Sequence, residues 1–162
     1  MIVNKDNFYE VINKLFISFP EKITKVTQEE FEKVFKCEMA KNSKNIVYIW
    51  KTQKPISRVD GCSEILYIGQ TKQSFKDRYL KYANLEATSE ANSLKYKTII
   101  EKYGAIEIMV CDFSMFGETL LEAEGQLLWW YFQNHCEYPP MNYTKTKIRR
   151  DEYLINKDIL FT

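Results

Sequence analysis

Residues 64–82, which read EILYIGQTKQSFKDRYLKY, gather residue types that suit the binding of a phosphate group. Tyr67 lies in an apolar segment that ends at Gly69. Arg78 and Tyr82 follow one helical turn apart, so they share a face of the helix expected there. An arginine guanidinium offers parallel N–H donors that match the oxygens of a phosphate. An arginine that merely packs along a tyrosine ring would show the same spacing.

Glu124 is the carboxylate whose position packing explains least well. The helix predicted around it carries an apolar stripe, and Glu124 lies in the middle of that stripe. The stripe consists of Leu120, Leu121, Leu127, Leu128, Tyr131 and Phe132. An ionised carboxylate that faces a core is costly unless a cation or strong donors meet it. A bound cation would explain the position, and so would a glutamate at the rim that the helix N-terminal dipole stabilises.

Apolar periodicity and turn residues predict an alternating series of helices and strands. Helices are expected over residues 5–19, from Thr27 to about 39, from Ser74 to about 86, over 93–103 and over 117–135. Strands are expected over residues 45–50, 64–69 and 105–113, with loops at 52–63 and 87–93. The fold class that follows is α+β, with a small, mainly antiparallel three-stranded sheet flanked by helices.

The first two strands are expected to pair as a hairpin, which would place Tyr48 and Tyr67 on one face of the sheet. Cross-strand packing alone would also explain two such tyrosines. The length of 162 residues fits one compact unit. Within it we expect an N-terminal helical extension over 1–44, a core over 45–145 and a basic C-terminal tail over 146–162.

Composition narrows the class of protein. No apolar run approaches the ~20 residues that span a bilayer, and the N-terminal MIVNKDNFYE lacks the pattern of a signal peptide. A cytoplasmic protein without membrane contact is therefore expected. The four cysteines are scattered and His135 is the single histidine, so reduced thiols are expected rather than a zinc site.

The near-neutral total charge hides an uneven distribution. Residues 45–82 hold seven Lys/Arg against three Asp/Glu, and residues 144–150 (TKTKIRR) hold four positive charges and no negative one. Such a local patch can guide a polyanion, although a solvated surface would look the same. The candidate nucleic-acid contacts are Lys54, Arg58, Lys72, Lys76, Lys145, Lys147, Arg149 and Arg150.

Five features in order resemble the GIY-YIG nuclease family, over about residues 45–145. They are Tyr48 in the strand IVYIW, the YIG at 67–69, Arg78 on a helix, Glu124 in EAEGQLL and Asn142 in PPMN. The first motif reads Ile-Val-Tyr rather than Gly-Ile-Tyr, and the connection between the two tyrosines is long. Tyr82, one turn past Arg78, resembles the tyrosine that some restriction enzymes of the family carry at this position.

The resemblance implies hydrolysis of phosphodiester bonds with a single metal ion. Glu124 would hold Mg²⁺ or Mn²⁺, with waters completing the coordination shell. Arg78 would contact the scissile phosphate, and Asn142 would brace the site through hydrogen bonds. The fold implied is a GIY-YIG-like sheet with helices around it.

The resemblance also assigns roles to the tyrosines. Tyr48 would be the general base, and Tyr67 would position the water or the phosphate. A tyrosine hydroxyl ionises near pH ~10, so Tyr48 would need positive charge nearby to act at neutral pH. Arg78, the metal, Tyr82 or Lys54 could help to deprotonate it.

The function expected is a metal-dependent DNA endonuclease, of a small sequence-specific restriction type or from a phage or mobile element. Double-stranded DNA is the expected partner, and a homodimer is possible because two-fold targets suit two-fold enzymes. One alternative is a catalytically inactive nucleic-acid-binding module on the same fold. Another is a protein-interaction domain in which the tyrosines only pack.

Overall fold

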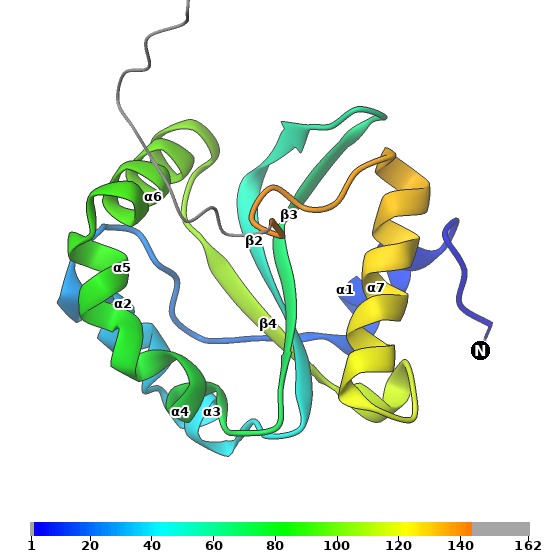
Figure 1. Ribbon diagram of the computed structural model, residues 1–162, viewed down its shortest axis with the longest axis horizontal. Helices are drawn as coiled ribbons and strands as arrows, with labels where there is room; N and C mark the ends of the chain where they lie inside the picture. The colour runs from blue at the N-terminus through cyan, green and yellow to red at the C-terminus, as the bar shows by residue number, and fades with distance from the viewer. Residues whose placement is uncertain (1, 144–162) are drawn as a thin grey trace, which may run out of the picture.

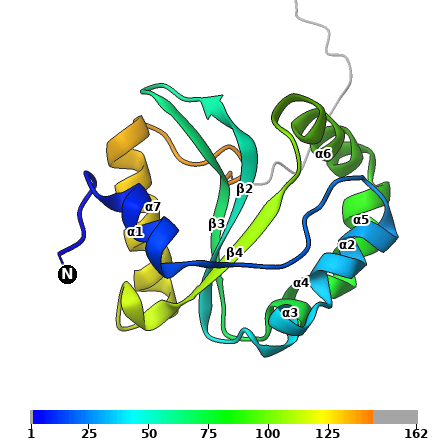
Figure 2. The same ribbon diagram turned by 180° about the vertical axis from the view of Figure 1, so that it is seen from behind.

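A four-stranded antiparallel sheet separates two layers of helices in the computed structural model, which describes residues 2–143 (Figure 1). The strand order is β1 (Ile17–Ser18), β4 (Glu107–Asp112), β2 (Ile46–Ser57) and β3 (Cys62–Thr71). Helices α1 (Phe8–Leu15) and α7 (Leu120–His135) cover one face, and the other helices cover the opposite face (Figure 2). The predicted α+β class with a flanked antiparallel sheet is confirmed.

The predicted number of three strands is wrong, because part of the expected first helix pairs with the sheet. The helix expected over 5–19 ends at Leu15, and Ile17–Ser18 pairs with Val110 and Met109 as β1. Phe19 N–H then donates to the carbonyl of Ile108 at 2.8 Å. Pro20 favours this course, since a residue before proline is pushed into an extended conformation.

The second layer consists of five helices, three of which begin with a side-chain cap. They are α2 (Gln28–Phe35), α3 (Glu38–Asn42), α4 (Phe75–Tyr79), α5 (Ala83–Thr88) and α6 (Glu90–Tyr103). The hydroxyls of Thr27, Ser74 and Ser89 accept from the backbone N–H three residues on.

Two predicted boundaries in this layer are wrong. The helix expected to reach 39 breaks after Phe35, which allows both Phe35 and Ala40 to be buried. Residues five apart in a continuous helix would lie on different faces. The loop expected over 87–93 is mostly α6, because Ser89 caps a helix that starts at Glu90.

The hairpin of β2 and β3 is longer than predicted. The loop expected over 52–63 shrinks to a turn at 58–61, where Gly61 has a φ of +67°. The register pairs Tyr48 with Gly69 and Trp50 with Tyr67, and it becomes irregular between Lys51 and Ile56. Pro55 lies in that irregular stretch, where the lack of a backbone N–H does not remove a hydrogen bond between the strands.

Strand β2 divides the hydrophobic core into two clusters. Tyr48 and Trp50 pack with the aromatic residues of the five-helix layer, whereas Val47 and Ile49 pack against α1 and α7. The first cluster includes Phe31, Phe35, Phe75, Tyr79 and Tyr96. The second includes Phe8, Ile12, Ile68, Leu127 and Tyr131.

His135, at the C-terminal end of α7, ties this helix to the hairpin turn. Its Nδ1 lies 2.7 Å from the carbonyl oxygen of Asp60, to which only an N–H can donate. Its Nε2 forms a hydrogen bond with the hydroxyl of Tyr9, which lies 2.8 Å from the Ser63 hydroxyl. The bonds hold one end of the hairpin against α1 and α7.

The glycine of the YIG sequence makes room for a tyrosine ring. Tyr48 lies across Gly69 on the neighbouring strand, and a Cβ atom on Gly69 would approach the Tyr48 Cζ and hydroxyl oxygen to 2.6 Å. Tyr48 itself is 1% exposed and held from the other side by Phe75 and Tyr79. The ring cannot retreat, so position 69 requires a residue without a side chain.

Gly69→Ala should therefore lower the free energy of unfolding by about 1–3 kcal/mol, as is usual for an overpacked core. Gly125→Ala is the matched control, because nothing lies within 4 Å of a Cβ at that exposed position in α7. The control should stabilise the helix by up to ~1 kcal/mol. Urea unfolding measures both, and equal effects would contradict the packing described for Tyr48 and Gly69.

Candidate functional site

Tyr67 lies close enough to a carboxylate and to a guanidinium from opposite layers of the fold for both charges to act on its pKa. It is on the edge strand β3, Arg78 is on α4, and Glu124 is on α7. The pKa of Tyr67 lies above its ordinary value of 10.0, because of burial first and the negative charge of Glu124 second. The positive charge of Arg78 acts in the opposite direction on the same pKa. Three of the predicted site residues are therefore near enough to interact electrostatically.

The two charged residues beside Tyr67 have no salt-bridge partners within residues 2–143. Neither Arg78 nor Glu124 forms an ion pair there. Burial raises the pKa of Glu124. Arg78 is half-buried, with its guanidinium carbon 5.4 Å from the centroid of the Tyr79 ring. Both charges therefore remain available to a ligand.

Tyr48 reaches the same region from the neighbouring strand, but its hydroxyl is buried. Its ring centroid lies 6.1 Å from that of Tyr67, and a 2.6 Å hydrogen bond joins its hydroxyl to that of Tyr79. The pKa of Tyr48 is raised by burial first and then by Tyr79, while Arg78 acts to lower it. A buried phenol of this kind has no direct path to bulk water.

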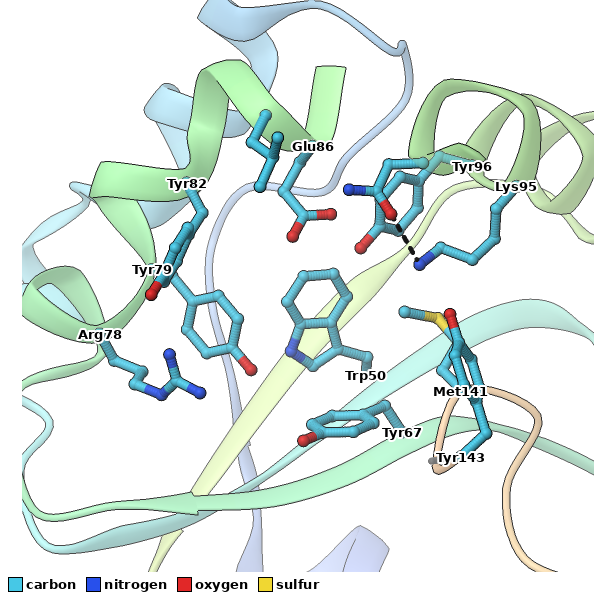
Figure 3. Close-up of a pocket in the computed structure, with 12 residues that line it drawn as sticks. Trp50, Tyr67, Arg78, Tyr79, Tyr82, Glu86, Lys95, Tyr96, Met141 and Tyr143 are labelled. Atoms are coloured by element: carbon cyan, nitrogen blue, oxygen red, sulfur yellow. Dashed lines mark hydrogen bonds between the residues drawn. The ribbon is translucent and has the colours of Figure 1, made fainter. Parts of the chain in front are cut away.

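Tyr79 is the residue of the site that the sequence analysis missed. Spacing drew attention to Tyr82, yet Tyr79 contacts Tyr48, while Tyr82 is 36% exposed at the rim (Figure 3). The Arg78 guanidinium carbon lies 5.9 Å from the centroid of the Tyr82 ring. A usable signal existed, since Phe75 and Tyr79 are four residues apart and form the buried face of α4.

Asn142 clamps the free edge of β3 next to Tyr67. Its side-chain oxygen accepts from the Ile68 N–H at 3.0 Å, and its side-chain nitrogen donates to the Ile68 carbonyl at 2.9 Å. The N–H of Met141 also donates to the carbonyl of Leu66. These contacts hold residues 141 and 142 against the edge of β3; the catalytic role expected of Asn142 stays a prediction.

The predicted nucleic-acid contacts fall into separate groups. Arg58 forms an ion pair through Nε with Glu137 at 2.9 Å and donates to the carbonyl of Tyr138, so its charge is largely offset. Lys54 is exposed on β2, six residues from Tyr48, which is roughly 20 Å along a strand. It is therefore not placed to deprotonate Tyr48.

Lys72 and Lys76 lie at the connection between β3 and α4, close in sequence to Arg78. Lys72 is exposed, and Lys76 is half-buried in the first turns of α4. Lys145, Lys147, Arg149 and Arg150 lie outside the described residues.

A metal ion at this site would have to rely on Glu124. Within residues 2–143, no group of three or more His, Cys, Asp or Glu side chains could hold a metal ion. Mg²⁺ is, however, commonly held by one or two carboxylates, with waters and substrate phosphates as the other ligands. A half-buried carboxylate without a cation partner suits such a shell.

Comparisons of the chain with models of protein families, with curated proteins and with solved structures find no match. Among the helices that the structure describes, none is both long and apolar enough to cross a bilayer.

Glu124→Gln should lower the pKa of Tyr67, because it removes a negative charge that opposes ionisation of the phenol. Arg78→Gln should raise the same pKa for the opposite reason. Glu122→Gln is the control, since Glu122 is exposed on the same helix and a glutamine preserves its bonds to the helix start. The ¹³Cζ chemical shift of Tyr67 against pH reports the pKa. Equal values in the Glu122 and Glu124 variants would contradict the arrangement.

Proposed function

We propose that the protein is a metal-dependent nuclease that hydrolyses phosphodiester bonds in DNA. The observation that supports this most is that the charges of Glu124 and Arg78 both act on Tyr67, while neither residue forms an ion pair in residues 2–143. Hydrolysis of a phosphodiester needs positive charge next to the phosphate and a group that accepts a proton from the attacking water. These side chains can provide both.

Each residue has a separate task in this proposal. Glu124 would hold Mg²⁺ or Mn²⁺, and a bound ion would supply positive charge to the phosphate oxygens and to a bound water. Arg78 donates to the scissile phosphate, where developing negative charge strengthens the hydrogen bonds. Asn142 keeps the backbone of Ile68 in place, and with it the neighbouring Tyr67.

Tyr67 is a better candidate than Tyr48 for direct contact with the attacking water. Tyr67 and Arg78 line one pocket of about 310 Å³, whereas the hydroxyl of Tyr48 is buried and bonded to Tyr79. The Glu124 charge raises the pKa of Tyr67, so neutralising that carboxylate with a cation lowers it. Metal binding and activation of the tyrosine are coupled in this way. Tyr48 and Tyr79 then position Tyr67 and Arg78 rather than contacting the water.

Double-stranded DNA is the proposed substrate, with a small sequence-specific restriction-type or phage or mobile-element enzyme as the proposed class. Lys72 and Lys76 precede Arg78 and would contact the phosphates next to the scissile one. A homodimer would supply the two sites that cutting both strands requires.

The burial of Tyr48 supports a second candidate, an inactive nucleic-acid-binding module on the same scaffold. In such a protein the tyrosine pair would only pack, and Arg78 would bind phosphate without chemistry. The two candidates differ in their need for a divalent cation at Glu124.

Supercoiled plasmid incubated with the protein and Mg²⁺ or Mn²⁺ should be nicked or linearised. Glu124→Gln should slow cleavage by at least ~100-fold, because the metal loses its carboxylate. Glu122→Gln, two residues earlier on the same helix, should cleave at the normal rate.

Binding of the plasmid measured in parallel separates the two candidates. Normal DNA affinity with intact plasmid in both metals would reject the nuclease and favour the binding module. Equal cleavage by the two glutamate variants would reject Glu124 as the metal ligand.

A further inference from the structure

A pocket of about 310 Å³ extends from the proposed phosphate site into the five-helix layer (Figure 3). Tyr67 and Arg78 belong to both. The pocket also reaches Trp50 on β2, Glu86 on α5, and Lys95 and Tyr96 on α6. Its volume is at the small end of the range for small-molecule pockets, about 300–1,000 Å³. Its size suits one planar ring system rather than an extended ligand.

The interior of the pocket contains one donor and one acceptor that lack partners. Nε1 of Trp50 and Oε2 of Glu86 are both buried, and neither atom has a hydrogen-bond partner among residues 2–143, although the pKa of the Tyr96 hydroxyl is raised by burial first and then by the nearby Glu86 carboxylate. In Figure 3 the Glu86 carboxylate points toward the Trp50 indole. A buried polar atom left unpaired costs about 1–3 kcal/mol, more for a charged group. A ligand that offers both a donor and an acceptor would remove both costs.

Aromatic rings and cations surround this pair of atoms. Tyr67, Tyr79, Tyr82 and Tyr96 contribute rings to the wall. Arg78 lies at one rim and Lys95 at the opposite rim (Figure 3). Nucleic-acid bases stack on such rings at about 1–3 kcal/mol each, and the phosphates on either side of a base would meet the two cations.

We propose that this pocket takes an unstacked nucleobase of the strand bound at the phosphate site. Glu86 accepts from an N–H of the base edge, Trp50 donates to an acceptor on the same edge, and Tyr82 stacks on the base at the rim. The identity of the bound strand rests on the proposed nuclease function. The pocket itself can be tested without cleavage.

The chemistry favours a base over the two other ligands that aromatic pockets bind. An apolar side chain would leave both Trp50 Nε1 and Glu86 Oε2 unpaired. A methylated ammonium would satisfy Glu86 and the rings, but not the Trp50 N–H, and Arg78 and Lys95 would repel it.

The indole N–H signal of Trp50 in a ¹H–¹⁵N spectrum reports the occupant directly. Trp129 and Trp130 serve as internal references, because they lie on α7 across the sheet. The four deoxynucleoside 5′-monophosphates are titrated without divalent metal, beside deoxyribose 5-phosphate and tetramethylammonium. At least one nucleotide should shift the Trp50 signal, while the sugar phosphate leaves it in place.

Two variants test the pocket contacts separately. Glu86→Gln should weaken the nucleotide about tenfold or more, because a charged acceptor is lost. Tyr82→Leu at the exposed rim should weaken it through the loss of stacking, and Glu90→Gln, outside the pocket, should change nothing.

The outcomes separate the pocket from the nuclease. A Trp50 signal that no nucleotide moves, in protein that still cleaves plasmid, overturns the base pocket alone. A shift by tetramethylammonium but not by nucleotides assigns the pocket to a cation and overturns it as well. A nucleotide-dependent shift that Glu86→Gln weakens supports the pocket even in protein that leaves plasmid intact.

Discussion

The Tyr48 ring packs between Gly69 on one side and helix α4 on the other, and the position of α4 depends on this contact. The 2.6 Å bond between the Tyr48 and Tyr79 hydroxyls joins the central strand β2 to α4. Arg78 is the residue before Tyr79, so fixing the tyrosine also fixes the backbone position from which the Arg78 side chain extends. A side chain at position 69 would lift the ring and disturb both contacts. Packing in the core thereby sets the geometry of a charged group at the rim.

The site depends on β3 being an edge strand. Arg78 and Glu124 come from helices on opposite faces of the sheet, and both charges act on Tyr67, which lies on the edge strand β3. An open edge strand would also invite pairing with another chain. Asn142 and Met141 occupy the backbone groups of Ile68 and Leu66, so the edge is covered where the site is formed. The same hydrogen bonds therefore cover the edge of β3 and support Tyr67.

The strands that carry Tyr48 and Tyr67, the caps at Thr27 and Ser74, and helix α7 were predictable because local patterns specify them. Strand β1 was not predictable, since Phe16 and Phe19 also fit an apolar stripe at helical spacing. Its extended conformation depends on hydrogen bonds to β4, which is distant in the sequence. Glu124 and Tyr67 could each be singled out from the sequence, but local patterns could not place them close together, because the two meet only in the tertiary fold. Likewise, the sequence could not show that Tyr79 rather than Tyr82 contacts Tyr48, because this depends on how α4 packs on the sheet.

Paramagnetic broadening of NMR signals by Mn²⁺ tests most directly whether a metal ion binds between the two layers at Glu124. The account predicts that substoichiometric Mn²⁺ broadens signals of Glu124 and of Tyr67, and that it spares residues near His135 at the other end of α7. Glu124→Gln should abolish the effect, while Glu122→Gln should preserve it. Broadening that is centred elsewhere, or that survives in Glu124→Gln, would contradict the account.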